Sequence, residues 1–196
     1  QGSSGSDRAF LEAVACTLAA FRPEVKRRLV EQGLLMPTVQ WVFRMANKRV
    51  VSREDYLSGV AHPTVFDGTQ LNVEKMTDLA HALTPEVLPP WVEIRVVEED
   101  KFQPGRDYFD IGDREKLFDS PCSIARVYRS MTSKRRMVVS AEQSRDPQGK
   151  PLKFHWVVLR GDEASIAIKP LNDVGSRAEI VIPFSPRRPI REGEKL

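Results

Sequence analysis

A histidine and an aspartate lie close together in a polar stretch between predicted helices. In AHPTVFDGTQL, at positions 61–71, His62 and Asp67 have the side chains of a general base and its orienting group in a hydrolase. Such a pair also needs a nucleophile, and the chain has no signature of a nucleophile elbow, a zinc-peptidase helix or a phosphate-binding loop. Because His-Pro and Asp-Gly both favour a change of chain direction, we interpret the stretch as a turn. His62 and Asp67 remain the catalytic residues of an alternative function, a hydrolase of polysaccharide or ester substrates.

Three regularly spaced aspartates form a second group of side chains that could bind a metal ion or act as an acid. Asp107, Asp110 and Asp113 stand among aromatic residues in the segment 101–119. Calcium prefers carboxylate oxygens, but the segment lacks the glycine and the terminal glutamate of an EF-hand loop. We interpret it as a charged loop held by its aromatic side chains, with calcium binding as the alternative. In the hydrolase alternative, Asp107 or Asp110 would serve as an acid or a metal ligand.

The composition narrows the classes of function. The chain has 196 residues, 41% of them hydrophobic, and a formal net charge of +3, which is ordinary for a globular protein. Its basic groups at 26–28, 134–136 and 187–188 are short and lack interleaved aromatic residues, so we expect no nucleic-acid partner. No apolar run approaches the roughly 20 residues of a transmembrane helix. Cys16 and Cys122 are too few and too far apart for a metal knuckle, and whether they pair stays open.

Positions 7–90 have helical periodicity. The first six residues, QGSSGS, are typical of an artificial linker and are left out of the fold prediction. Apolar spacing predicts helices in 8–21, 23–33, 37–48 and 73–83, with a short capped helix after Ser52 and the cap of the last helix at Asn72. In the first helix, a row of small residues stands opposite the bulky stripe: Ala13, Cys16 and Ala20. A helix that is apolar on two sides is covered on two sides, either by later segments of the chain or by parts of a longer chain.

The pattern changes to strands after Pro89-Pro90. Alternating or β-branched runs predict strands in 91–99, 123–130, 135–142, 153–161, 164–171 and 177–184, separated by turn residues. Short strands at such intervals are typical of an antiparallel sandwich. The double proline is the predicted boundary between a helical region, 7–90, and a β domain, 91–196.

The polar bend between two of these strands resembles a known module. The sequence SAEQSRDPQGKPLKFHW (140–156) combines a Ser/Ala-rich turn, an S-x-D-P-x-G bend and an aromatic-x-Trp strand, in which Asp146, Gly149 and Trp156 are the defining residues. It resembles the start of a polycystic-kidney-disease (PKD) repeat, an immunoglobulin-like extracellular module. The bend fits a strand connection, since Asp and Pro start turns and Gly149 can adopt a positive φ. Trp156 is expected between two sheets, and Asp146 is the one position that the resemblance offers for cation contact, with turn formation preferred.

These observations predict an α+β protein with an N-terminal helical region and a C-terminal antiparallel immunoglobulin-like β-sandwich. The sandwich would be divergent, completed by the strand near 91–97, or incomplete. The resemblance implies a non-enzymatic interaction or spacer module of a larger bacterial envelope or secreted protein, with a protein or polysaccharide partner. Trp41 and Trp91 would be the aromatic residues of a glycan site, although core packing is the preferred interpretation of both. No cofactor is expected apart from calcium in the alternative above.

Overall fold

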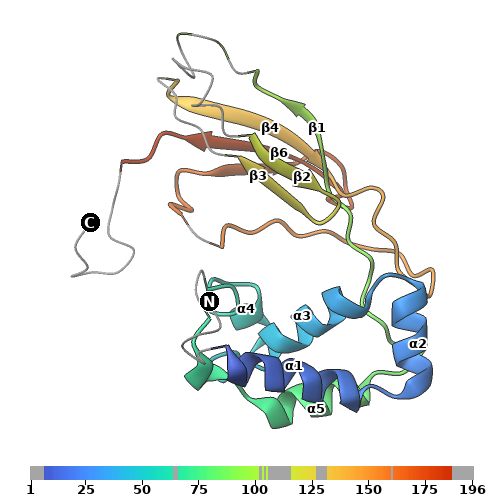
Figure 1. The fold of residues 1–196 in the computed structure, drawn as a ribbon. Coiled ribbons are helices and arrows are strands. Elements are labelled where there is room, and N and C mark those ends of the chain that lie inside the picture. Colours follow the sequence, from blue (N-terminus) through green and yellow to red (C-terminus); the bar gives the residue numbers. More distant parts are fainter. Residues whose placement is uncertain are drawn as a thin grey trace. The chain divides into compact units, whose positions relative to one another are not determined.

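The computed structural model describes residues 7–63, 66–101, 103, 105, 116–126, 132–159 and 161–186 (Figure 1). The chain forms two compact units, which we call the helical unit and the β unit. The helical unit comprises residues 1–91 together with 145–151, and the β unit comprises residues 92–144 and 152–196. The chain therefore leaves the helical unit after Trp91, returns to it for seven residues, and leaves it again.

Five helices and a short 3₁₀ turn make up the described part of the helical unit. They are α1 (Arg8–Ala20), α2 (Pro23–Glu31), α3 (Leu35–Met45), α4 (Arg53–Tyr56), the 3₁₀ turn Gly68–Gln70 and α5 (Val73–Ala82). The predicted caps are confirmed. Ser52 and Asp55 form a reciprocal capping box at α4, and the Asn72 side chain accepts a hydrogen bond from the Lys75 backbone N–H at α5.

The core of the helical unit is built from completely buried aliphatic residues. Val25 and Leu29 of α2 lie in one cluster with Ala80 of α5, and Val42 of α3 lies in a second cluster with Met76. The remaining members of the two clusters are Phe21, Leu34, Val39, Leu83 and Leu88, and Ala13 and Ala46. Every long helix therefore contributes to buried apolar surface, which is the main stabilising term in folding.

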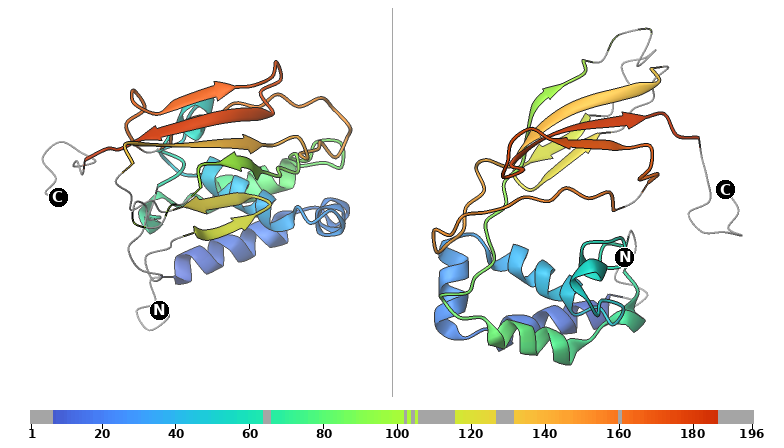
Figure 2. Two further views of the ribbon diagram at one scale, coloured as in Figure 1. Left: turned by 90° about the horizontal axis from the view of Figure 1, so that it is seen from above. Right: turned by 180° about the vertical axis from the view of Figure 1, so that it is seen from behind.

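Helix α1 is covered on two sides only in part. Val14 and Leu18 of the bulky stripe pack against the larger cluster, and Ala13 of the small row lies in the smaller one. Ala13 is completely buried against Met76, and Thr17 beside it is buried and donates its hydroxyl to the Ala13 carbonyl oxygen. Cys16 is exposed, and Leu11 of the supposed core stripe is 68% exposed. The small side chains face the core because they let α1 lie close to α5 (Figures 1 and 2), so part of the bulky stripe turns outward.

The β unit contains a four-stranded antiparallel sheet and a two-stranded hairpin. The sheet has the order β1 (Arg95–Glu99), β4 (Lys134–Ser140), β6 (Arg177–Pro183) and β5 (Ala167–Pro170). The hairpin pairs β2 (Lys116–Ser120) with β3 (Ser123–Arg126). Helices followed by antiparallel strands confirm the α+β class. Among the described helices, none has the length and apolar character needed to cross a bilayer.

Two of the strand predictions were wrong. Strand β2 lies within the segment that we interpreted as a charged loop. In contrast, the described residues of 153–161 form no strand ladder, although Phe154 and Trp156 are half-buried and their neighbours are exposed in the predicted alternation. This segment is held by the Phe154 backbone N–H, which donates to the Val174 carbonyl oxygen at 2.9 Å. Gly175 permits that close approach, since a Cβ there would lie 2.5 Å from the Phe154 carbonyl oxygen.

The register of β4 with β6 gives the sheet two different faces. Arg135, Met137 and Val139 pair with Ile182, Ile180 and Ala178, and these residues form what we call the cavity face, because alternate residues point to the same side. The opposite, charged face carries Arg136, which forms ion pairs with Glu98 of β1 and Glu179 of β6. The apolar side chains of the cavity face need another element of the chain to cover them.

Candidate functional site

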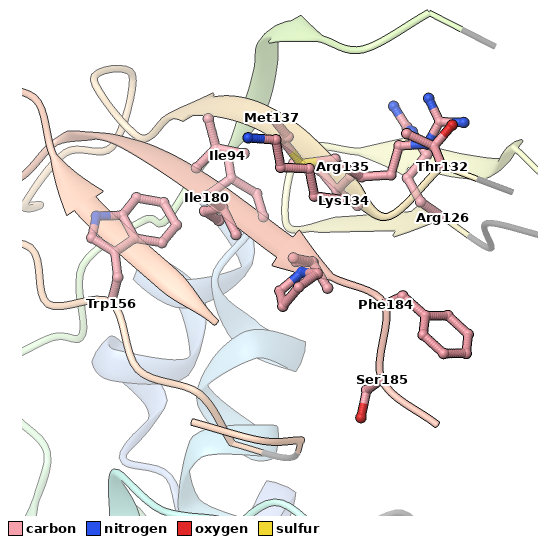
Figure 3. Close-up of a pocket in the computed structure, with 14 residues that line it drawn as sticks. Ile94, Arg126, Thr132, Lys134, Arg135, Met137, Trp156, Ile180, Phe184 and Ser185 are labelled. Carbon is pink, nitrogen blue, oxygen red and sulfur yellow. The ribbon is translucent and has the colours of Figure 1, made fainter. Parts of the chain in front are cut away.

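A cavity of about 650 Å³ lies on the cavity face of the β unit (Figure 3). Its volume is within the range of small-molecule binding sites, roughly 300–1,000 Å³. The apolar residues that line it come from five separate segments: Ile94, Ile124, Met137, Val139, Trp156, Ile180, Ile182, Pro183 and Phe184. Its other lining residues are Arg126, Thr132, Lys134, Arg135 and Ser185.

The sheet supplies one wall of the cavity. Met137 of β4 stands opposite Ile180 of β6, and Val139 follows two residues along β4 on the same face. Val139 is buried, whereas Met137 and Ile180 are half-buried. Their side chains thus have part of their surface on the cavity, so the sheet presents a continuous apolar surface to a ligand.

The hairpin supplies Ile124 and Arg126 and is fixed by an ion-pair network. The Arg126 guanidinium donates through Nε and Nη2 to both carboxylate oxygens of Glu99 at 2.8 and 3.0 Å, and through Nη1 to Asp119. Only 4% of the Arg126 side chain is exposed. The hydrogen bonds that Arg126 donates to Glu99, and then those that it donates to Asp119, raise the pKa of Arg126, and an arginine is protonated in any case. Arg126 ties β3 to β1 and closes one side of the cavity.

Trp156 forms the apolar end of the cavity. Its indole Nε1–H donates to the Gly175 carbonyl oxygen at 2.7 Å, which fixes the ring. Trp156 lines the cavity together with Ile124 of the hairpin and Ile180 of the sheet. Its expected place between two sheets stays a prediction. Figure 3 shows Trp156 at one end and Arg126, Thr132 and Arg135 together toward the other.

The two predicted catalytic residues, His62 and Asp67, are not hydrogen-bonded to each other in the structure. The His62 Nε2 lies 3.0 Å from the Tyr56 carbonyl oxygen, and burial, followed by the charge of Arg44, lowers the His62 pKa. The Asp67 carboxylate accepts hydrogen bonds from the N–H and the hydroxyl of Thr69, and these bonds lower its pKa. Asp67 therefore caps the 3₁₀ turn, as the turn interpretation expects, and no hydrogen bond connects it to His62.

Asp146 also has a structural role. Its Oδ1 accepts hydrogen bonds from the backbone N–H groups of Gln148 and Lys150 at 2.8 and 3.2 Å, and Gly149 has a φ of +73°. The predicted turn is confirmed. In the part of the chain that the structure describes, no group of three or more His, Cys, Asp or Glu side chains is arranged to hold a metal ion. Asp107, Asp110 and Asp113 lie outside the described residues.

The bend containing Asp146 packs within the helical unit. Trp91 and Arg145 exchange two backbone hydrogen bonds, of 2.8 and 2.9 Å, and the Arg145 guanidinium lies over the indole ring at 5.0 Å. Trp91 and Trp41 both pack against the larger core cluster of this unit. The preferred interpretation of these two tryptophans as core residues is therefore confirmed.

Sequence reasoning did not find the cavity. The alternation in 135–142 and 177–184 indicated which side chains share a face, and those residues do form its wall. The opposite wall depends on β2 pairing with β3 and on the Arg126 ion pairs, and neither pattern had been recognised. No family model, curated protein or solved structure matches this chain.

Proposed function

We propose that this protein is a non-enzymatic binding module that encloses an apolar ligand or group in the cavity of the β unit. The observation that carries the proposal is the apolar lining, contributed by the sheet, the hairpin and Trp156 around a volume of about 650 Å³. Burial of apolar surface is the main favourable term in such binding, and sites of this kind combine apolar walls with a few polar groups.

The same chemistry favours an apolar ligand over a polysaccharide. Sugars present many hydroxyl groups, each of which needs a hydrogen-bond partner when it is buried. The indole N–H of Trp156 is already donated to Gly175, and Trp41 and Trp91 pack against the helical core. The hydrolase alternative loses support, because His62 and Asp67 have separate partners.

The finer fold assignment is part of the same proposal. A divergent immunoglobulin-like sandwich of the PKD type would have the four-stranded sheet and the β2–β3 hairpin as its layers. The antiparallel pairing, the turn at Asp146 and the place of Trp156 support this assignment. The PKD resemblance is also the support for an envelope or secreted location within a longer bacterial protein.

Binding of N-phenyl-1-naphthylamine, a neutral probe that fluoresces in apolar surroundings, tests the proposal. We expect saturable binding to the full chain. The substitution Ile180→Trp should weaken it by about tenfold or more, because the added ring occupies the space that the probe needs. Val181→Trp is the matched control, since the register places Val181 opposite Arg136 on the other face of the same strand.

Circular dichroism and thermal melting establish that both variants are folded, and Met137→Phe replaces Ile180→Trp if the latter is not. Absence of saturable binding to the folded protein, or equal binding by the cavity-face and Val181→Trp variants, would contradict the proposed function.

A further inference from the structure

The charged side chains that line the cavity are all positive. Of the described residues that line it, three are cations and none is an aspartate or glutamate. The apolar residues extend to Trp156, away from the end where Arg126, Arg135 and Thr132 gather (Figure 3). The cavity thus has one apolar and one cationic end.

The three cations are not equivalent. Arg126 already faces two carboxylates, those of Glu99 and Asp119, so its charge is matched within the protein. Lys134, the first residue of β4, is exposed and lines the cavity. Its side chain makes no hydrogen bond or ion pair with the described residues. Arg135 also has an interaction partner within the protein. The Lys134 ammonium group can therefore pair with an acid without breaking an ion pair with a described residue.

We infer, on the basis of the proposed function, that the ligand is an amphipathic monoanion: an aliphatic or aromatic carboxylate whose acid group pairs with Lys134 while its apolar part lies toward Trp156. A neutral apolar molecule would fill the walls equally well but would offer no anionic partner to the Lys134 ammonium group. An acid joined to an apolar body matches both ends.

Two probes that differ by one acid group test this inference. 8-Anilinonaphthalene-1-sulfonate is N-phenyl-1-naphthylamine with a sulfonate added. We expect the anionic probe to bind about fivefold more tightly at low salt, as an exposed ion pair can provide. The difference should shrink in roughly 1 M salt, where charges are screened within about 3 Å. Octanoate should displace the anionic probe at lower concentration than octanol does.

Lys134→Gln should remove the preference for the anionic probe, measured as the ratio of the affinities of the two probes for the same variant. Lys169→Gln is the matched control, because Lys169 is an exposed lysine of β5 that does not line the cavity. It should retain the preference.

The outcomes separate this inference from the function on which it rests. Equal binding of the two probes, both lost in Ile180→Trp, would overturn the acidic ligand and leave the binding function standing. A preference that survives in Lys134→Gln would also overturn it. Failure of both probes to bind would remove the proposed function, and the acidic ligand with it.

Discussion

The helical unit and the β unit are stabilised in different ways. In the helical unit, completely buried aliphatic side chains from α2, α3 and α5 form two clusters. In the β unit, the buried apolar residues are Val138, Val139, Ala141 and Ala178, on or beside the two central strands. The hairpin is joined to the sheet by the ion pair of Arg126 with Glu99, and Arg126 also pairs with Asp119 within the hairpin.

This difference explains where a ligand site can form. Closely packed aliphatic clusters have no room for a ligand, because protein interiors pack as densely as organic crystals. In the β unit, the hairpin that covers the sheet is held by an ion pair, so a cavity can remain between the hairpin and the sheet. The proposed binding site is therefore in the β unit.

The largest expected effect is in the helical core. Leu29→Ala should lower the free energy of unfolding by about 2–5 kcal/mol, the usual loss for a buried leucine, because Leu29 is completely buried. Leu11→Ala, the same change at a side chain that is 68% exposed, should remain within about 0.5 kcal/mol of the parent. Urea denaturation followed by the helical circular dichroism signal measures both. Equal losses would mean that the helical core is not the main source of stability in its unit.

The second effect concerns the hairpin of the β unit. Arg126→Met leaves Glu99 and Asp119 facing each other without a cation, and we expect a loss of about 2 kcal/mol. This is less than the usual cost of breaking a fully buried pair, because the carboxylate side chains are 25% and 38% exposed. The loss should be accompanied by weaker binding of the neutral naphthylamine probe.

Arg136→Met is the matched control, since Arg136 also pairs with two glutamates but its side chain is 36% exposed. We expect a smaller loss of stability and unchanged probe binding. If the two arginine variants behaved alike in both measurements, the ion pairs of Arg126 would not be what keeps the cavity covered.

The helices were predictable because their signals are local. Apolar spacing, Asn72 and the Ser52–Asp55 pair all act within a few residues of the chain. The strands β4 and β6 were predictable for the same reason, since their alternation is visible in 135–142 and 177–184.

The features that the sequence did not predict depend on contacts between segments that are distant along the chain. The position of the segment 153–159 depends on Gly175, 21 residues after Phe154 along the chain, which lets the Phe154 carbonyl oxygen approach so closely. The cavity is decided by Arg126 reaching Glu99, a residue 27 positions earlier. The bend at Asp146 had the predicted turn, but its packing in the helical unit required Trp91 to pair with Arg145. None of these pairings is visible in the local pattern.

The smallest expected effect is a pH dependence confined to the helical unit. Burial, and then the charge of Arg44, lower the pKa of His62, outweighing the opposing hydrogen bond to Tyr56. As the pH falls below the ordinary histidine pKa of about 6.5, the unfolded chain therefore binds a proton more readily than the folded chain does. The stability that neutral His62 provides is complete above that pH, and it is lost as the pH falls towards the lower folded pKa.

Unfolding of the parent and of His62→Gln between pH 8 and pH 5 measures this contribution. The glutamine variant should lose less stability than the parent on acidification, whereas His81→Gln retains His62 and should follow the parent. Because both histidines belong to the helical unit, the difference should appear in the helical signal and leave probe binding by the β unit unchanged. Parallel pH profiles for the parent and His62→Gln would show that protonation of His62 does not couple to folding, and an altered probe affinity in His62→Gln would contradict the location of the proposed binding site in the β unit.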